Sequence, residues 1–380
     1  MILSLAVVAI LIAAGAGVYF YTNSGSDGKD SFEVTTTGLN HFNNYEIDLD
    51  DKTVAEHGLK IGEEIELDFG GEKYKGIYTA NYNGAPLFGL FVNRNSNGAH
   101  SIGMFNYDMT RVIKCETGSK ITISHEGVIS ELIKKTPKYS AGYSNDPKDY
   151  SSAAEYANFR EVNLGNIKDD FIWRSASPYP YYISERYGYV DSLLEEHGVE
   201  YLIMMNINND AADDWPEDSD YSGSLVRQGK VVMKNLSPAV FSHEDEILFV
   251  LQSVIDSEGK LGFSCSLGKD RTGFYVAVLE ALAGAPYADI REDYMVSFCN
   301  LYKIEPHSEE YETIANVLCD AMFYAMGHTE ALDDPTSVDW MHMEYDVDSI
   351  DAYSCVHGYL VDKLGVSEEM IQSVIDRITA

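Results

Sequence analysis

The alternation of apolar and polar residues divides the chain into segments of different character, and the first is an apolar run over residues 1–22. As a helix this run would extend about 31 Å, close to the thickness of a bilayer core. No Lys or Arg precedes it, so a cleaved signal peptide and an uncleaved transmembrane anchor remain alternatives. Residues 23–30, rich in Ser, Gly and Asp, predict a linker. We therefore expect a membrane-anchored or secreted protein whose body is extracytoplasmic.

Residues 31–136 show the period of two that is typical of half-buried strands. From Ile65 to Phe69 apolar and acidic residues alternate, and Gly70-Gly71 then predicts a turn into the second strand of a hairpin. Short β-type runs follow at 87–92 and 120–124. These features predict a small all-β domain. We see no metal-ligand spacing, nucleophile with a base, or glycine-rich phosphate loop in it, so we expect a spacer or a binding module.

After a connecting segment at 137–156, the pattern changes to alternating helix and strand. Such alternation predicts an α/β domain over residues 157–380, with a central sheet flanked by helices. The expected elements are a helix at 189–197, strands at 199–205, 230–233 and 261–264, a helix with Ser242 as its N-cap, and a helix opened by Thr272-Gly273.

Charge and cysteine content narrow the function classes. Lys+Arg 27 against Asp+Glu 61 leaves a formal net charge of -34. A nucleic-acid surface needs clustered cations to replace counterions on the phosphates, so we expect no nucleic-acid partner. The five cysteines are an odd number spread over a long chain, which argues against a disulfide scaffold.

One loop carries the chemistry of the α/β domain. It follows the strand at 261–264 and reads Cys265-Ser266-Leu267-Gly268-Lys269-Asp270-Arg271-Thr272-Gly273. Between a strand and a helix N-terminus, the backbone N–H groups of such a loop can hold a phosphate dianion. The same positive field favours a thiolate at Cys265, and Arg271 can meet two phosphoryl oxygens with its planar fork. Gly268 permits the tight turn, and the Thr272 hydroxyl can hydrogen-bond the sulfur.

This loop resembles the signature loop of the bacterial atypical tyrosine and lipid phosphatases, within the cysteine-based protein-tyrosine-phosphatase superfamily. Three further segments are similar to landmarks of that family: 158–165, 173–176 and 359–369. The resemblance implies a cysteine-phosphatase-type sheet, and hydrolysis of phosphorylated proteins or lipids through a cysteinyl-phosphate, without metal or cofactor. It implies Cys265 as nucleophile and Asp270 as acid. It implies Arg271 as the third catalytic residue, which holds the equatorial oxygens together with the loop amides. The substrate-binding residues that it implies are Ser266, Leu267, Gly268, Lys269 and Thr272, and Lys269 is the feature linked to phosphoinositides.

Other acids compete with Asp270. Glu217, within Trp215-Pro216-Glu217, imitates the acid loop of better-known tyrosine phosphatases, but it lies upstream of the position that this loop normally occupies. Glu244 and Asp245 are further alternatives. Asp270 could instead only pair with Lys269 or Arg271 and order the loop.

Position 264 departs from the family pattern. The family usually has histidine before the nucleophile, whereas this chain has Ser264. A hydroxyl can hydrogen-bond but has no cationic form to support the thiolate. This difference keeps open an alternative function, a catalytically weak module that binds phosphorylated ligands.

Overall fold

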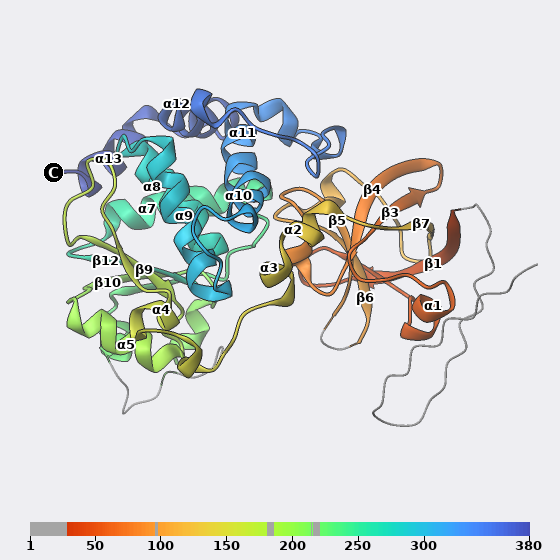
Figure 1. The fold of residues 1–380 in the computed structure, drawn as a ribbon. Helices are drawn as coiled ribbons and strands as arrows, with labels where there is room; N and C mark the ends of the chain where they lie inside the picture. Colours follow the sequence, from red (N-terminus) through yellow and green to blue (C-terminus); the bar gives the residue numbers. More distant parts are fainter. Residues whose placement is uncertain (1–28, 96–97, 181–185, 214, 216–220) are drawn as a thin grey trace, which may run out of the picture.

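The computed structural model describes residues 29–95, 98–180, 186–213, 215 and 221–380. The apolar run at 1–22, nearly all of the linker at 23–30, and Glu217 lie outside these residues. Among the described helices, none combines the length and the apolar character needed to cross a bilayer. The described chain forms a β barrel followed by an α/β domain, as Figure 1 shows.

The predicted all-β domain is confirmed as a closed barrel of seven strands in the order β1-β2-β6-β5-β4-β3-β7. The strands are β1 (Asp30–Leu39), β2 (Tyr45–Ile47), β3 (Glu63–Phe69), β4 (Glu72–Thr79), β5 (Leu90–Arg94), β6 (His100–Met104) and β7 (Lys120–Ile129). The predicted hairpin joins β3 to β4. Gly70 and Gly71 have φ values of 76° and 111°, a left-handed backbone that favours glycine at both positions. Short helices α1 (Asp51–Glu56), α2 (Glu131–Lys135) and α3 (Pro137–Ala141) accompany the barrel.

The predicted central sheet of the α/β domain is also present, with five strands in the order β11-β10-β12-β9-β8. They are β8 (Arg160–Val162), β9 (Ile172–Ala176), β10 (Tyr201–Met204), β11 (Val231–Met233) and β12 (Leu261–Cys265). Strands β9 to β12 run parallel to one another, and only β8 is antiparallel, where it pairs with β9. Because parallel strands end at one edge of a sheet, the loops after β9 to β12 meet there.

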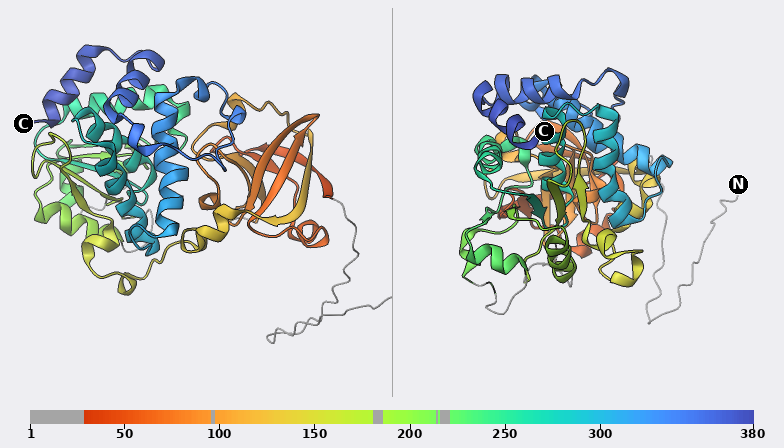
Figure 2. Two further views of the ribbon diagram at one scale, coloured as in Figure 1. Left: turned by 45° about the horizontal axis from the view of Figure 1, so that its top comes forward. Right: turned by 90° about the vertical axis from the view of Figure 1, so that its left-hand side faces the viewer.

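Helices cover both faces of this sheet (Figures 1 and 2). On one face lie α4 (Ala153–Ala157), α5 (Arg186–Glu196) and α6 (Tyr221–Arg227); on the other lie α7 (Glu244–Asp256) and α8 (Asp270–Leu282). The layer continues toward the barrel and the C-terminus with α9 (Tyr287–Tyr302), α10 (Glu309–Ala315), α11 (Ala321–Gly327), α12 (Ala352–Gly358) and α13 (Glu368–Ile378). Strand β10 shows the pleat behind this division, since Leu202 and Met204 join the α5 cluster while Ile203 joins the opposite one.

The barrel packs directly on the α/β domain. The ring of Phe88 lies 5.1 Å from that of Phe241 and 4.7 Å from that of Trp340. The Tyr107 hydroxyl donates to the Leu332 carbonyl at 2.9 Å. Buried apolar residues of the two domains therefore form one continuous core.

Two local predictions are wrong, and both errors lie at this interface. The N-cap of α7 is His243, not Ser242, whose hydroxyl accepts a hydrogen bond from the Asp108 N–H of the barrel at 2.8 Å. The strand predicted to begin at Leu87 begins at Leu90, because the Leu87 N–H donates to the Val317 carbonyl instead of to a strand. Contacts with the other domain override the local pattern at these positions.

Candidate active site

The loop singled out in the sequence lies where β12 ends and α8 begins. Cys265 is the last residue of β12 and is only 3 % exposed. Arg271, in the first turn of α8, reaches the loops after β10 and β11: its Nη1 donates to the carbonyls of Met205 at 2.6 Å and Leu236 at 2.9 Å. Its Nη2 donates to the Ser266 hydroxyl at 2.9 Å. The arginine thus joins three strand ends around the cysteine.

Gly268 is required by the geometry of the loop. Its φ of +67° is left-handed, and a Cβ added there would lie 2.4 Å from the carbonyl carbon and oxygen of Ser175, at the end of β9. The loop therefore approaches β9 so closely that a side chain at this position would displace it.

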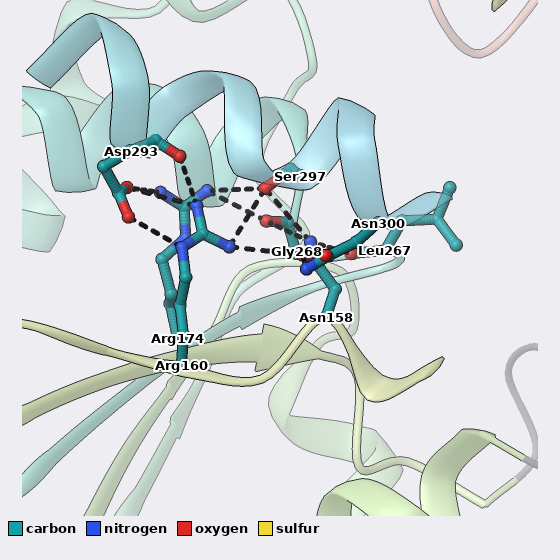
Figure 3. Close-up of polar contacts among 8 residues, drawn as sticks. All are labelled: Asn158, Arg160, Arg174, Leu267, Gly268, Asp293, Ser297 and Asn300. Atoms are coloured by element: carbon teal, nitrogen blue, oxygen red, sulfur yellow. Dashed lines mark hydrogen bonds and ion pairs between the residues drawn. The ribbon is translucent and has the colours of Figure 1, made fainter. Parts of the chain in front are cut away.

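A polar network supports the loop from behind (Figure 3). We call it the buttress, and it consists of Asn158, Arg160, Arg174, Asp293, Ser297 and Asn300. The Asn158 amide donates to the Leu267 carbonyl at 2.9 Å and to the Gly268 carbonyl at 3.1 Å. Arg174 donates to the same Gly268 carbonyl at 3.0 Å. Two successive loop carbonyls are thus held against the buttress.

This direction of the carbonyls decides the direction of the amides. In a trans peptide the N–H points opposite to the carbonyl, so the N–H groups of Gly268 and Lys269 point away from the buttress. Within the described part of the chain, the N–H groups of Leu267, Gly268 and Lys269 donate to no protein acceptor. Free amides beside a helix N-terminus are what an oxyanion cradle needs.

Buried charges hold the buttress together. The Asp293 carboxylate lies 2.7 Å from both the Arg160 Nε and the Arg174 Nη1, and the Arg174 side chain is only 1 % exposed. Burial alone would raise the pKa of Asp293, but the two guanidinium groups outweigh it and lower that pKa below its usual value. Asp293 is therefore ionised at neutral pH.

Lys269 lies in a different environment from the one that direct phosphate binding would require. Its side chain is fully buried, and its Nζ lies 5.1 to 5.8 Å from the ring centres of four aromatic residues, which we call the cage: Tyr82, Tyr139, Phe298 and Tyr302. The Nζ donates to the Tyr302 hydroxyl at 3.1 Å. The ammonium is thus held by ring faces and a hydroxyl and is shielded from solvent.

Asp270 is the candidate acid that directly follows the loop in the chain. It opens α8, is 21 % exposed, and its Oδ1 lies 3.3 Å from the Lys269 Nζ. The pairing with Lys269 that the sequence left open is therefore formed. Glu244 pairs instead with Arg111 of the barrel at 3.3 Å, and Asp245 is exposed beside Lys234.

Two hydroxyls of the loop region make no hydrogen bond with the described residues. The Oγ of Ser264 and the Oγ1 of Thr272 are buried, and neither hydrogen-bonds to any described residue. The bond from Thr272 to the sulfur that the sequence suggested is not made. All five cysteines are free thiols. Among the described residues, no three His, Cys, Asp or Glu side chains are placed to share a metal ion.

Much of the buttress was not assigned a role from the sequence. Asn158, Arg160 and Arg174 stand in segments that carry the family resemblance, but Asp293, Ser297 and Asn300 were missed. A signal was present, because these three follow one another at spacings of four and three, which places them on one face of α9.

Part of this chain is similar to known proteins. Residues 185–380 match the family model described as tyrosine phosphatase family, a match that includes the loop, α8 and α9 but not the barrel. No curated protein matches. Among solved structures, an uncharacterized conserved protein from Thermotoga maritima is similar with a TM-score of 0.23 and 15% identity. That similarity covers 24% of this chain and 35% of the other.

Proposed function

This chain belongs to the tyrosine phosphatase family, and from that membership we propose that it hydrolyses phosphate monoesters through a cysteinyl-phosphate on Cys265. The observation that carries the proposal is the orientation of the loop. Its carbonyls are bound by Asn158 and Arg174, so its amides are free to surround an oxyanion above the sulfur.

In the first step, the Cys265 thiolate attacks phosphorus while the bond from phosphorus to the leaving oxygen breaks. The loop amides and Arg271 bind the equatorial oxygens, where charge develops. The hydrogen bonds that Arg271 makes with the described residues use Nη1 and Nη2, and its Nε–H has no acceptor among those residues. The Nε–H and the second hydrogen of Nη2 can therefore donate to phosphoryl oxygens.

Asp270 is proposed as the acid. Its carboxyl group gives its proton to the leaving oxygen, which departs as an alcohol or a phenol. In the second step, water gives a proton to Asp270 and attacks phosphorus, the bond from sulfur to phosphorus breaks, and inorganic phosphate leaves with the thiolate restored. Asp270 is suited to both steps because it opens α8, directly after the loop, and is partly exposed.

For the substrate, we propose phosphorylated tyrosine in proteins or phosphoinositides. The burial of Lys269 removes one argument for the lipid, because its ammonium is not available at the surface. The net charge of -34 repels polyanions at long range, which favours singly phosphorylated esters. We further propose, from the apolar run at 1–22, that the protein acts outside the cytoplasm, anchored or secreted.

A second candidate function is a module that binds phosphorylated ligands with little turnover. The hydroxyls of Ser264 and Thr272 favour this candidate, because neither hydrogen-bonds to the Cys265 sulfur or to any other described residue. A cradle can bind an oxyanion even where the nucleophile is poorly activated.

Turnover distinguishes the two functions. The full-length protein should hydrolyse p-nitrophenyl phosphate, and Cys265→Ser should lose activity on the order of 10⁴-fold or more, because the variant lacks the nucleophile. Orthovanadate should inhibit the wild type. A protein that binds vanadate yet turns over no faster than Cys265→Ser would establish the binding module instead.

A further inference from the structure

Lys269 connects the phosphatase loop to the β barrel. Tyr82 and Asn83 lie in a short 3-10 helix (Tyr82–Gly84) between β4 and β5, and the Tyr82 ring forms one wall of the cage. The Asn83 amide donates to the Tyr302 hydroxyl at 3.2 Å, and the same oxygen accepts from the Lys269 Nζ. The barrel thus touches the loop lysine directly and through one shared hydroxyl.

The backbone of Lys269 belongs to the site itself. Its N–H is one of the free amides of the cradle, and its carbonyl accepts from the Gly273 N–H at 2.8 Å in the first turn of α8. Its neighbour in the chain is Asp270, whose carboxylate pairs with its ammonium. Fixing the side chain of Lys269 therefore also fixes an amide, a helix start and the proposed acid.

We propose that the β barrel is a positioning element of the phosphatase site: Tyr82 and Asn83, together with Tyr302, hold Lys269 so that the cradle amide and the Asp270 carboxylate stay where phosphoryl transfer uses them. This inference rests on the proposed function. It assigns a role to a domain that lies outside the family match.

Simple packing does not account for a lysine at this position. An apolar side chain could fill the space between the rings without the desolvation that a buried ammonium suffers. Burial lowers the pKa of Lys269, but the Asp270 carboxylate and the tyrosines around it more than compensate and raise that pKa well above its usual value. The cage therefore holds a cation, and its closest carboxylate is the proposed acid.

A matched pair of substitutions tests the proposal in the full-length protein. Tyr302→Phe removes the hydroxyl that joins Asn83 to Lys269, and Tyr107→Phe removes another buried hydroxyl that bonds across the same interface, to the Leu332 carbonyl. We expect similar losses of thermal stability. We expect Tyr302→Phe to lower kcat for phenyl phosphate about tenfold, and less for p-nitrophenyl phosphate, whose better leaving group depends less on the acid. Tyr107→Phe should stay within about twofold of the wild type.

A second pair of substitutions distinguishes the proposed role from a loss of folding. Tyr82 is 40 % exposed, so its substitution leaves a small cavity at most. Tyr82→Ala should reduce kcat and weaken orthovanadate binding severalfold, and Tyr82→Phe, which keeps the ring face, should restore both. Equal kinetics for Tyr302→Phe and Tyr107→Phe, or no difference between Tyr82→Ala and Tyr82→Phe, would overturn the proposal. If the wild type itself shows no turnover, the proposed function fails, and vanadate affinity across the same variants still decides the role of the barrel.

Discussion

The buttress and the cage hold the same loop by different means. The buttress binds two loop carbonyls with an amide and a guanidinium, and its two arginines share the Asp293 carboxylate within the α/β domain. The cage binds one side chain with ring faces and a hydroxyl, and it takes Tyr82 from the barrel. One determines how the peptide planes are turned, and the other determines where a cation and its partner carboxylate lie.

This difference indicates that the buttress and the cage have different roles. Turning a peptide plane creates or abolishes a cradle, so the buttress should be necessary for any oxyanion binding. A displaced Lys269 side chain would move the existing cradle only slightly. Loss of the cage should therefore lower the catalytic rate more than the stability of the fold. Loss of the buttress is accordingly expected to have the larger effect.

The largest effect is expected for Asp293→Asn. The substitution leaves the Arg160 and Arg174 guanidinium groups buried without their carboxylate, and breaking a buried pair in this way costs about 3–5 kcal/mol of unfolding free energy. Orthovanadate binding should be lost as well, because Arg174 no longer holds the Gly268 carbonyl in place. Urea denaturation and vanadate titration measure the two effects.

The control for Asp293→Asn is an exposed pair with similar geometry. Asp51 meets the Arg94 Nε at 2.8 Å, but both side chains are about half exposed or more. Asp51→Asn should change stability far less, as is usual for surface ion pairs, and should leave vanadate binding unchanged. Equal losses of stability and of vanadate binding in the two variants would show that the buttress does not support the loop.

The general architecture follows from local patterns in the sequence. The hairpin between β3 and β4 was predictable because two glycines supply the left-handed backbone of its turn. The strands β10 to β12 were predictable because short apolar runs between turn signals are typical of buried parallel strands. The family resemblance located the loop, and the match over residues 185–380 confirms the family.

Contacts between distant segments could not be predicted in this way. Asn83 and Tyr302 are 219 positions apart, and nothing in either local pattern marks them as neighbours. The role of Ser242 changed for the same reason, since its hydroxyl bonds to Asp108 of the barrel. Lys269 was expected to bind the substrate because it stands in the loop. Its position in the sequence does not show that aromatic rings from three other segments surround its side chain.

An intermediate effect is expected for Gly268→Ala, which tests how the loop sits between the buttress and β9. A Cβ at this position has an unfavourable φ and lies 2.4 Å from backbone atoms of Ser175, so we expect a loss of about 1–3 kcal/mol and of vanadate binding. Gly70→Ala shares the left-handed φ but meets no atom within 4 Å, and should lose only about 1 kcal/mol. If the two variants lose the same stability and Gly268→Ala still binds vanadate, the close approach is unimportant.

The smallest effect is a pH dependence of the buttress. The pKa of Asp293 is lowered in the folded state, so its contribution is complete above the ordinary carboxyl pKa of 3.8 and is lost as pH falls through the folded value. Burial and the Asp293 carboxylate raise the pKa of the nearby Glu280 well above its usual value. The stability difference between wild type and Asp293→Asn should shrink as the pH falls below 3.8 toward the folded value of Asp293. Urea unfolding of both proteins at each pH gives this difference, in which the carboxyl groups far from Asp293 cancel because they titrate alike in both proteins. A difference that stays constant down to pH 3 would mean that the two arginines do not lower the pKa of Asp293.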